Sequence, residues 1–326
     1  MTKKARESRA GLFTRIVARY YLRKPELDRF LEIKYPTLAS RWHAAGNEWA
    51  YLRKSRRSHR LTAVNIELTN RCNLACVMCP VNRDMSRKKK DLEFDAFRRI
   101  LDENLALELI LMFQWGESLL VPDFFDRVAY AVERGVRVMV TTNGTLLDER
   151  TCHRIVASGL DRITISVDGA ARTHETIRGF PLADLRRNVE RLVRMRDEAG
   201  SNLGIDINMT LWEENEEEAP EVRRQWEGVV DRVQFIPRFV DAPRSVPCRE
   251  LWRGALVVLS DGRVAPCCRD SEGELTVGHL DDGTLEEIWN GEAMAALRDR
   301  HRQGDFPPLC AQCGEYATEQ VHPRFS

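Results

Sequence analysis

The sequence predicts an α/β fold with a parallel sheet, followed by a small cysteine-rich region. From residue 63, short apolar runs alternate with longer segments of helical periodicity, the order expected when crossover helices connect parallel strands. The chain has 326 residues, of which 43% are apolar, and this is enough for one large domain with an appendage. The alternation itself does not distinguish an open sheet from a barrel.

Six apolar runs have the length and composition of buried parallel strands. The predicted strands are Ala63–Thr69, Glu108–Phe113, Val136–Thr141, Arg162–Val167, Leu203–Thr210 and Asp231–Ile236. The predicted helices between them cover residues 93–105, 122–134, 148–158, 182–199 and 216–227. Functional residues are expected in the loops after the carboxyl ends of the strands, where folds of this class carry their chemistry.

A second, smaller region begins near residue 240, where Pro237, Pro243 and Pro247 end the alternation. Five of the nine cysteines lie in it, and its apolar content is thin for a core of its own. A bound metal would explain both features, because cysteine ligands on a metal can stabilise a region whose apolar core is too small to fold alone. Its predicted elements are a hairpin, Ala255–Leu259 and Arg263–Pro266 turned by Asp261-Gly262, and a helix from Leu285 to about Arg302.

The first 60 residues form a basic leader, with 16 basic and 5 acidic residues, in a chain whose 50 basic and 50 acidic residues balance. The balance gives no reason to expect a nucleic-acid partner. An amphipathic helix is predicted in the leader, and it could either pack on the body or lie on an anionic membrane surface. The apolar stripe of this predicted helix consists of Leu12, Phe13, Ile16, Val17, Tyr20 and Tyr21.

The sequence lacks a run of about 18 apolar residues that could span a membrane, and the apolar core of a secretory signal. We therefore expect a cytoplasmic protein, with peripheral membrane contact if the leader lies on a lipid surface. Three parts are expected: a helical leader (1–61), an α/β core (62–240) and a cysteine-rich domain (241–326).

Three cysteines, Cys72, Cys76 and Cys79, follow the first predicted strand within eight residues. Such a loop can place three thiolates around one metal centre. A cubane iron–sulfur cluster takes one thiolate per iron, so three ligands leave one iron open. The alternatives are a zinc site with a fourth ligand from elsewhere, or a chance group of buried thiols.

This Cys-x3-Cys-x2-Cys motif resembles the signature of the radical S-adenosylmethionine (SAM) superfamily. The resemblance implies a partial (β/α)6 barrel and a [4Fe–4S] cluster on Cys72, Cys76 and Cys79, whose open iron binds SAM. It also implies reductive cleavage of SAM to a 5′-deoxyadenosyl radical that abstracts a substrate hydrogen, with a partner such as flavodoxin or ferredoxin as reductant. Met78 departs from the family pattern, which usually has an aromatic residue there.

Downstream stretches at the ends of the next strands also resemble this family. Gln114-Trp115-Gly116-Glu117-Ser118 corresponds to its Gly-Gly-Glu-Pro stretch, with departures at Trp115 and Ser118. Thr141-Thr142-Asn143-Gly144, Ser166-Val167-Asp168-Gly169 and Arg178-Gly179 correspond to further stretches that line the SAM site. The resemblance therefore implies these SAM-binding residues: Gly116, Glu117, Ser118, Thr141, Asn143, Ser166, Asp168 and Arg178.

Four more cysteines form a second set: Cys248, Cys267, Cys310 and Cys313. Four thiolates suffice for a complete iron–sulfur cluster or for a four-cysteine zinc site. The set resembles the SPASM/twitch extension of some radical SAM proteins, in its shortened form with one auxiliary [4Fe–4S] cluster. Two clusters are then expected in all. Cys152 is interpreted as a buried apolar residue, whereas Cys268 could be a ligand, a hydrogen-atom donor or chemically idle.

The sequence indicates the reaction less directly than it indicates the class of enzyme. One auxiliary cluster favours an oxidoreductase or epimerase that acts on a carbohydrate- or cyclitol-like alcohol, with a small molecule or glycan as substrate. The alternative is a peptide or protein maturase, whose basic leader could hold an acidic peptide. A third alternative is a zinc-stapled binding module without catalytic activity.

Overall fold

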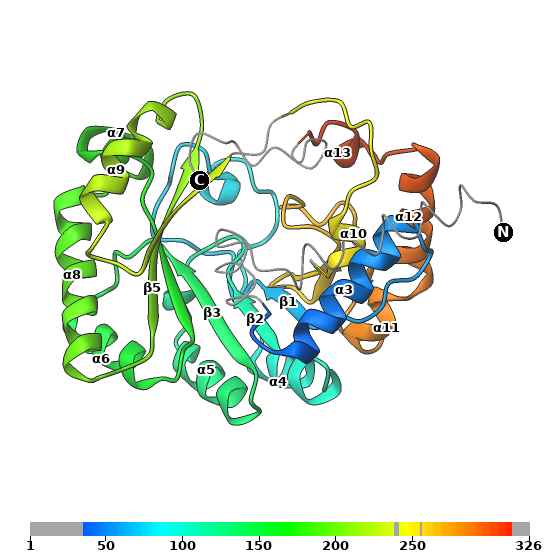
Figure 1. Ribbon diagram of the computed structural model, residues 1–326, viewed down its shortest axis with the longest axis horizontal. Coiled ribbons are helices and arrows are strands. Elements are labelled where there is room, and N and C mark those ends of the chain that lie inside the picture. The colour runs from blue at the N-terminus through cyan, green and yellow to red at the C-terminus, as the bar shows by residue number, and fades with distance from the viewer. Residues whose placement is uncertain (1–34, 238–240, 255, 315–326) are drawn as a thin grey trace.

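The computed structural model describes residues 35–237, 241–254 and 256–314 of the chain (Figure 1). In this part of the chain nine strands form one sheet, in the order β6-β5-β4-β3-β2-β1-β7-β8-β9. The first six are parallel, and the sheet does not close into a barrel, as expected for a partial (β/α)6 barrel. They are β1 (Ala63–Ile66), β2 (Leu109–Met112), β3 (Arg137–Thr142), β4 (Arg162–Ser166), β5 (Gly204–Leu211) and β6 (Arg232–Pro237).

The cysteine-rich region continues the same sheet. Strand β7 (Val257–Val258) pairs in parallel with β1, so Asn65 lies opposite Val257. Strands β8 (Arg263–Ala265) and β9 (Gly278–His279) follow in antiparallel order, which confirms the predicted hairpin. The two cysteine-bearing regions are therefore joined by backbone hydrogen bonds at β1.

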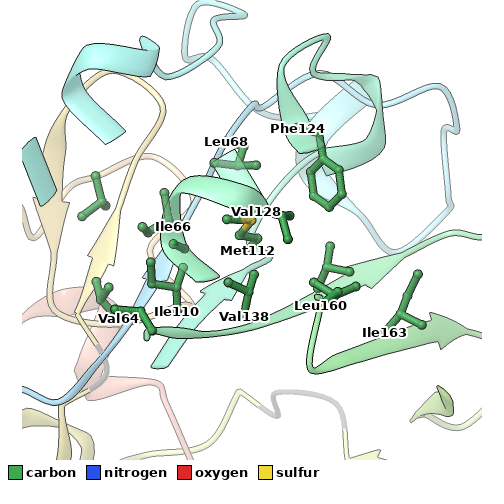
Figure 2. Close-up of a cluster of buried hydrophobic side chains, with 14 of the residues drawn as sticks. Val64, Ile66, Leu68, Ile110, Met112, Phe124, Val128, Val138, Leu160 and Ile163 are labelled. Carbon is green, nitrogen blue, oxygen red and sulfur yellow. The ribbon is translucent and has the colours of Figure 1, made fainter. Parts of the chain in front are cut away.

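Helices cover one face of the parallel part of the sheet (Figure 1). Side chains of β3 alternate, with Val138 and Val140 buried against the helices and Met139 half-buried on the other face. Figure 2 shows Ile66, Met112 and Val138 from three neighbouring strands gathered with Val128 of α5. The covering helices are α4 (Phe94–Glu103), α5 (Phe124–Glu133), α6 (Glu149–Ala157), α7 (Ala171–Arg178), α8 (Leu182–Glu198) and α9 (Ala219–Trp226).

Two helix predictions differ from the structure. The segment 216–227 is a short 3-10 helix, η3 (Glu216–Glu218), followed by α9, and the helix expected at 285–302 is two helices. Its break lies at Gly291, where an added Cβ would lie 2.8 Å from the carbonyl oxygen of Glu287. The remaining helices are η1 (Pro80–Asn82), η2 (Ser118–Leu120), α10 (Glu250–Arg253), α11 (Leu285–Trp289), α12 (Glu292–Gln303) and α13 (Pro308–Ala311).

The described end of the leader is helical and packs on the cysteine-rich region. Helix α3 (Leu38–Leu52) begins with a capping box between Thr37 and Ser40. Beyond it, the indole of Trp252 donates to the carbonyl of Ser55 at 2.6 Å. The predicted amphipathic stripe at residues 12–21 lies outside the described residues. Within the described part of the chain, no helix combines the length and apolar character that crossing a bilayer requires.

Candidate functional site

The three cysteines after β1 lie together on one loop. The amide of Cys79 donates to the carbonyl of Cys76 at 3.0 Å, which makes a tight turn between them. Burial raises the pKa of all three thiols, that of Cys76 to about 11, and negative charge on the neighbouring thiols raises it further for Cys76 and Cys79. Three mutually repelling, half-buried thiols are the donor set expected to lose their protons only when a cationic centre binds.

A buried cation, Arg178, faces this loop. Its charge lowers the pKa of Cys72, Cys76 and Cys79 and so opposes the effect of burial. Its guanidinium is held by Asp168, with Nη2 and Nε 2.6 and 2.7 Å from Oδ2. Burial disfavours the Arg178 cation, but Asp168 and the neighbouring Cys76 and Cys79 together outweigh it and raise the pKa of Arg178. The second Asp168 oxygen accepts from the amide of Thr210 at 2.9 Å.

Gly116 and Glu117 lie against the strand that leads into the cysteine loop. Gly116 has φ +100°, and an added Cβ would lie 2.2 Å from the carbonyl oxygen of Thr69, so glycine is required there. The Glu117 carboxylate is buried and accepts from the Asn143 amide at 2.8 Å and the Thr142 hydroxyl at 2.9 Å. Burial raises the pKa of Glu117, and these donors oppose the shift.

The other predicted SAM-binding residues lie at the same end of the sheet. Asn143 bonds Asn73 of the cysteine loop at 2.8 Å. Thr141 is the penultimate residue of β3 and lies opposite Thr164, and Ser166 is the last residue of β4 and lies opposite Asn208. The Ser118 hydroxyl donates to the carbonyl of Met112 at 3.0 Å, which secures the turn after β2.

Some residues of this region were missed by the sequence analysis. Thr142, next to the predicted Thr141, provides the hydroxyl that contacts Glu117. Glu218 accepts from the Ala170 amide and the Thr173 hydroxyl, both at 2.6 Å, and Asn215 donates to the carbonyl of Asp168 at 3.3 Å. The alternation of buried residues along β3 could have indicated Thr142, whereas Glu218 acts across 45 or more residues and carries no local signal.

The second cysteine set is brought together from three segments. Burial raises the pKa of Cys248 and, to about 12, that of Cys310, and in both cases negative charge on Cys267 adds to the effect. Cys313 turns back on Cys310, with its amide 3.1 Å from the Cys310 carbonyl. The backbone of Cys248 donates to Nδ1 of the buried His301 at 3.1 Å. Cys267 therefore interacts electrostatically with each of the other three thiols of the set.

Cys268 lies beside this set and also contacts the core of the fold. Its thiol hydrogen-bonds Cys267, which together with burial raises the pKa of Cys267. Its carbonyl accepts from Gln114 at 2.5 Å, and Gln114 belongs to the loop that carries Gly116. Cys152, by contrast, is fully buried in α6 among apolar residues, as interpreted from the sequence.

The two cysteine-bearing loops are tied together by a buried ion pair. Arg87 donates to Glu67 through both terminal nitrogens, at 2.8 and 2.7 Å, and both side chains are almost fully buried. Glu67 also accepts from the amide and hydroxyl of Ser260 at 3.0 and 2.8 Å, and Arg87 donates to the carbonyl of Ser271 at 2.6 Å. The pair thus connects the end of β1, the segment after the first cysteine set and the loop of Cys267.

The donor sets fit iron–sulfur clusters. Among the described residues, no three His, Cys, Asp or Glu side chains converge on the point that a single ion would occupy. The first set offers three thiols facing a buried cation, and the second offers four. A cubane with one open iron and a fully ligated cubane need these two numbers of thiolates. The numbers of thiols in the two sets therefore fit one cubane with an open iron and one fully ligated cubane on a partial α/β barrel.

Family models match both parts of the chain. Residues 66–225 match the radical SAM superfamily, and residues 248–314 match the iron–sulfur cluster-binding domain called SPASM. The chain is a member of the radical SAM superfamily with a C-terminal SPASM extension. Its cofactors are S-adenosylmethionine and [4Fe–4S] clusters, as predicted.

Several curated proteins are similar to this chain. An AdoMet-dependent heme synthase from Methanosarcina barkeri is 35% identical over 154 residues, which is 47% of this chain and 43% of that protein. The chain thus spans less than half of that relative's length. A PqqA peptide cyclase from Gluconobacter oxydans is 26% identical over 298 residues, 76% of this chain and 81% of that protein. The mycofactocin maturase MftC from Mycolicibacterium smegmatis is 26% identical over 298 residues, which is 77% of this chain and 74% of that protein.

A solved structure has the same fold. SuiB of Streptococcus suis, bound to S-adenosylmethionine, superposes with a TM-score of 0.61 at 14% identity, covering 95% of this chain and 82% of that chain. At that identity the likeness concerns the fold alone.

The buried ion pair predicts a large stability effect. Glu67→Gln leaves Arg87 buried without a counter-charge, so the free energy of unfolding should fall by about 3–5 kcal/mol. The matched control is Glu190→Gln, which removes the partner of an exposed i,i+4 pair with Arg186 and should cost less than about 1 kcal/mol. Denaturant unfolding measures both, and equal losses in the two variants would contradict the assigned role.

His174 predicts a pH dependence. Burial, and then the charge of Arg178, lowers the pKa of His174 to about 3, and its Nδ1 accepts from the Asp168 amide at 3.3 Å. Its contribution to stability is therefore complete above pH ~6.5, where the unfolded chain is also neutral, and is lost as the pH falls toward 3. His174→Asn keeps an acceptor without this titration.

The free energy of unfolding of His174→Asn should consequently change less between pH 7 and pH 5 than that of the unsubstituted chain. The exposed His153→Asn serves as the control and should leave the pH dependence unaltered. Superimposable pH profiles for the unsubstituted chain and His174→Asn would show that the buried ring does not titrate as described.

Proposed function

We propose that this protein is a radical SAM enzyme that modifies a peptide or protein substrate. One observation supports this proposal most: two relatives that match over about three quarters of the chain, 76% and 77%, are named as a peptide cyclase and a maturase. The heme synthase match is confined to about half of the chain. The similarity that extends over most of the chain therefore favours peptide modification.

These relatives favour the alternative from the sequence analysis over the hypothesis placed first there. The hypothesis of a carbohydrate or cyclitol oxidoreductase or epimerase rested on the presence of one auxiliary cluster. None of the three relatives described above has a name that refers to a carbohydrate. The small-molecule or glycan substrate is accordingly replaced by a peptide in the proposal.

In the proposed site, Cys72, Cys76 and Cys79 hold the cluster that binds SAM. When bound, this cluster supplies one electron for the cleavage of SAM to methionine and a 5′-deoxyadenosyl radical, which takes a hydrogen atom from the substrate. Arg178 stabilises the three thiolates, because its charge already favours their ionised form. Asp168 keeps the guanidinium in place.

The remaining proposed SAM-binding residues shape the space beside the loop. Gly116 allows close approach of the backbone, and Glu117, held by the Asn143 amide, fixes the ends of β2 and β3 relative to each other. Ser118, Thr141 and Ser166 complete the set at the same end of the sheet. Since these groups come from three neighbouring strands, they form a polar wall at the carboxyl ends, where α/β folds bind their ligands.

In the same proposal, Cys248, Cys267, Cys310 and Cys313 hold the auxiliary cluster. Four protein thiolates leave no open iron, so this site would serve electron transfer or structure rather than bind SAM. The proposed parts are the core at 62–240, the auxiliary domain at 241–326 and the leader at 1–61. The ion pair of Glu67 and Arg87 would keep the two cluster-binding loops at a fixed separation.

Substrate-stimulated SAM cleavage tests the proposed substrate class. The holoenzyme, reduced with dithionite, is incubated with SAM and either a peptide pool or a panel of aminosugars and cyclitols, and 5′-deoxyadenosine is quantified by chromatography. Peptides should stimulate its formation severalfold, and mass spectrometry should show a modified peptide. Cys72→Ala is the control and should form none. Stimulation by the sugar panel alone would overturn the peptide proposal.

A further inference from the structure

A strongly basic segment, residues 82–91, follows the first cysteine set. It contains five basic residues and two acidic ones. The body of the chain, residues 61–326, has the opposite balance, with 34 basic and 45 acidic residues. A positive segment in an otherwise acidic body creates a local positive potential, which can attract a negatively charged partner to this part of the surface.

This basic segment is fastened along the loop that carries Cys72, Cys76 and Cys79. The Asn82 amide donates to the carbonyls of Cys72 and Leu74 at 3.2 and 2.6 Å. The Arg83 guanidinium donates to the carbonyl of Val77. The Lys89 ammonium donates to the carbonyl of Asn70, just before the loop, at 3.0 Å. The positive charges are consequently held beside the cysteine loop.

Three of the basic side chains remain available to a partner. Arg87 is neutralised by Glu67, and the Lys89 ammonium is engaged by the carbonyl of Asn70. Lys88, Lys90 and Arg83 are exposed, and no carboxylate of the described residues forms an ion pair with them. The loop itself exposes an apolar side chain, Val77, which is 42% accessible. This surface therefore offers unpaired cations around an apolar contact point.

We propose that Arg83, Lys88, Lys90 and Val77 form the docking surface for a small acidic protein that carries one electron. The inference rests on the proposed function, because a SAM-cleaving cluster on this loop needs an electron from outside. One electron leaves the carrier for each SAM cleaved, and no atom is transferred between the two proteins. Opposite charge raises the association rate of such encounters, and electron-transfer complexes are small and transient.

An acidic peptide substrate is the competing occupant. The position of the cations favours the electron carrier. Arg83 donates to the carbonyl of Val77 in the cysteine loop, and the backbones of Lys88 and Lys90 hydrogen-bond the Asn70 side chain just before that loop. Electron transfer requires close approach to this loop, whereas a peptide needs access to the carboxyl ends of β2 to β4, where the polar wall lies. If the electron carrier binds here, replacing these cations should weaken the binding of the carrier; if an acidic peptide binds here, the same replacement should weaken the binding of the peptide.

The test uses the double variant Lys88→Glu/Lys90→Glu in the holoenzyme, with photoreduced flavodoxin as the probe. Both the Kd for flavodoxin at low salt, measured by titration calorimetry, and the apparent KM for flavodoxin in 5′-deoxyadenosine formation should rise about tenfold or more. The salt dependence of both should weaken. SAM cleavage with dithionite should be unchanged. The control, Arg150→Glu/Arg194→Glu on α6 and α8, carries the same charge change and should behave like the unsubstituted enzyme.

Unchanged flavodoxin affinity in Lys88→Glu/Lys90→Glu would overturn the proposal, as would an equal loss with dithionite, which would locate the damage in the cluster site. A loss of peptide affinity with normal flavodoxin affinity would also overturn it and assign the surface to the substrate. Failure of the unsubstituted enzyme to cleave SAM with dithionite would instead contradict the proposed function, and is distinguishable from these results.

Discussion

The architecture of the site depends on one buried ion pair, Glu67 with Arg87. A buried pair of this kind is strongly destabilising to break, because either partner alone is an uncompensated charge in a low-dielectric interior. The Glu67 carboxylate also accepts both hydrogen bonds of Ser260. The segment after the first cysteine set and the turn before Cys267 are thus fixed to the same carboxylate. Two cluster-binding loops that must stay at a constant separation would require a connection such as this ion pair.

A second constraint acts on the thiols themselves. Burial raises the pKa of Cys72, Cys76, Cys79, Cys248 and Cys310, and a hydrogen bond from Cys268 together with burial raises that of Cys267. Arg178 offsets part of this effect on the first set, and Asp168 keeps it there. Arg244 offsets part of it for Cys248 and Cys310 of the second set. Each set therefore has a nearby cation that favours the thiolate forms of its cysteines.

Much of the fold could be predicted because its parallel strands are rich in apolar residues and at least one of their faces is buried, so that most appear as short apolar runs. All six predicted strands exist, with ends shifted by up to three residues, as for β1, which ends at Ile66. Helix α7 was not predicted, since its residues are mostly polar. In the site, the cysteines and Gly116 have local signatures. Arg87 and Glu218 do not, because their partners lie 20 and 45 or more residues away and only the tertiary fold brings them together.

The most direct measurement is the iron content of the anaerobically reconstituted chain and of Cys72→Ala/Cys76→Ala/Cys79→Ala, together with SAM cleavage under dithionite. Since a cubane contains four irons, the account predicts about eight irons per chain and about four in the variant. Only the unsubstituted chain should form 5′-deoxyadenosine. About four irons with cleavage intact would show that the second cysteine set holds no cluster. No iron and no cleavage, with zinc bound instead, would contradict the account as a whole.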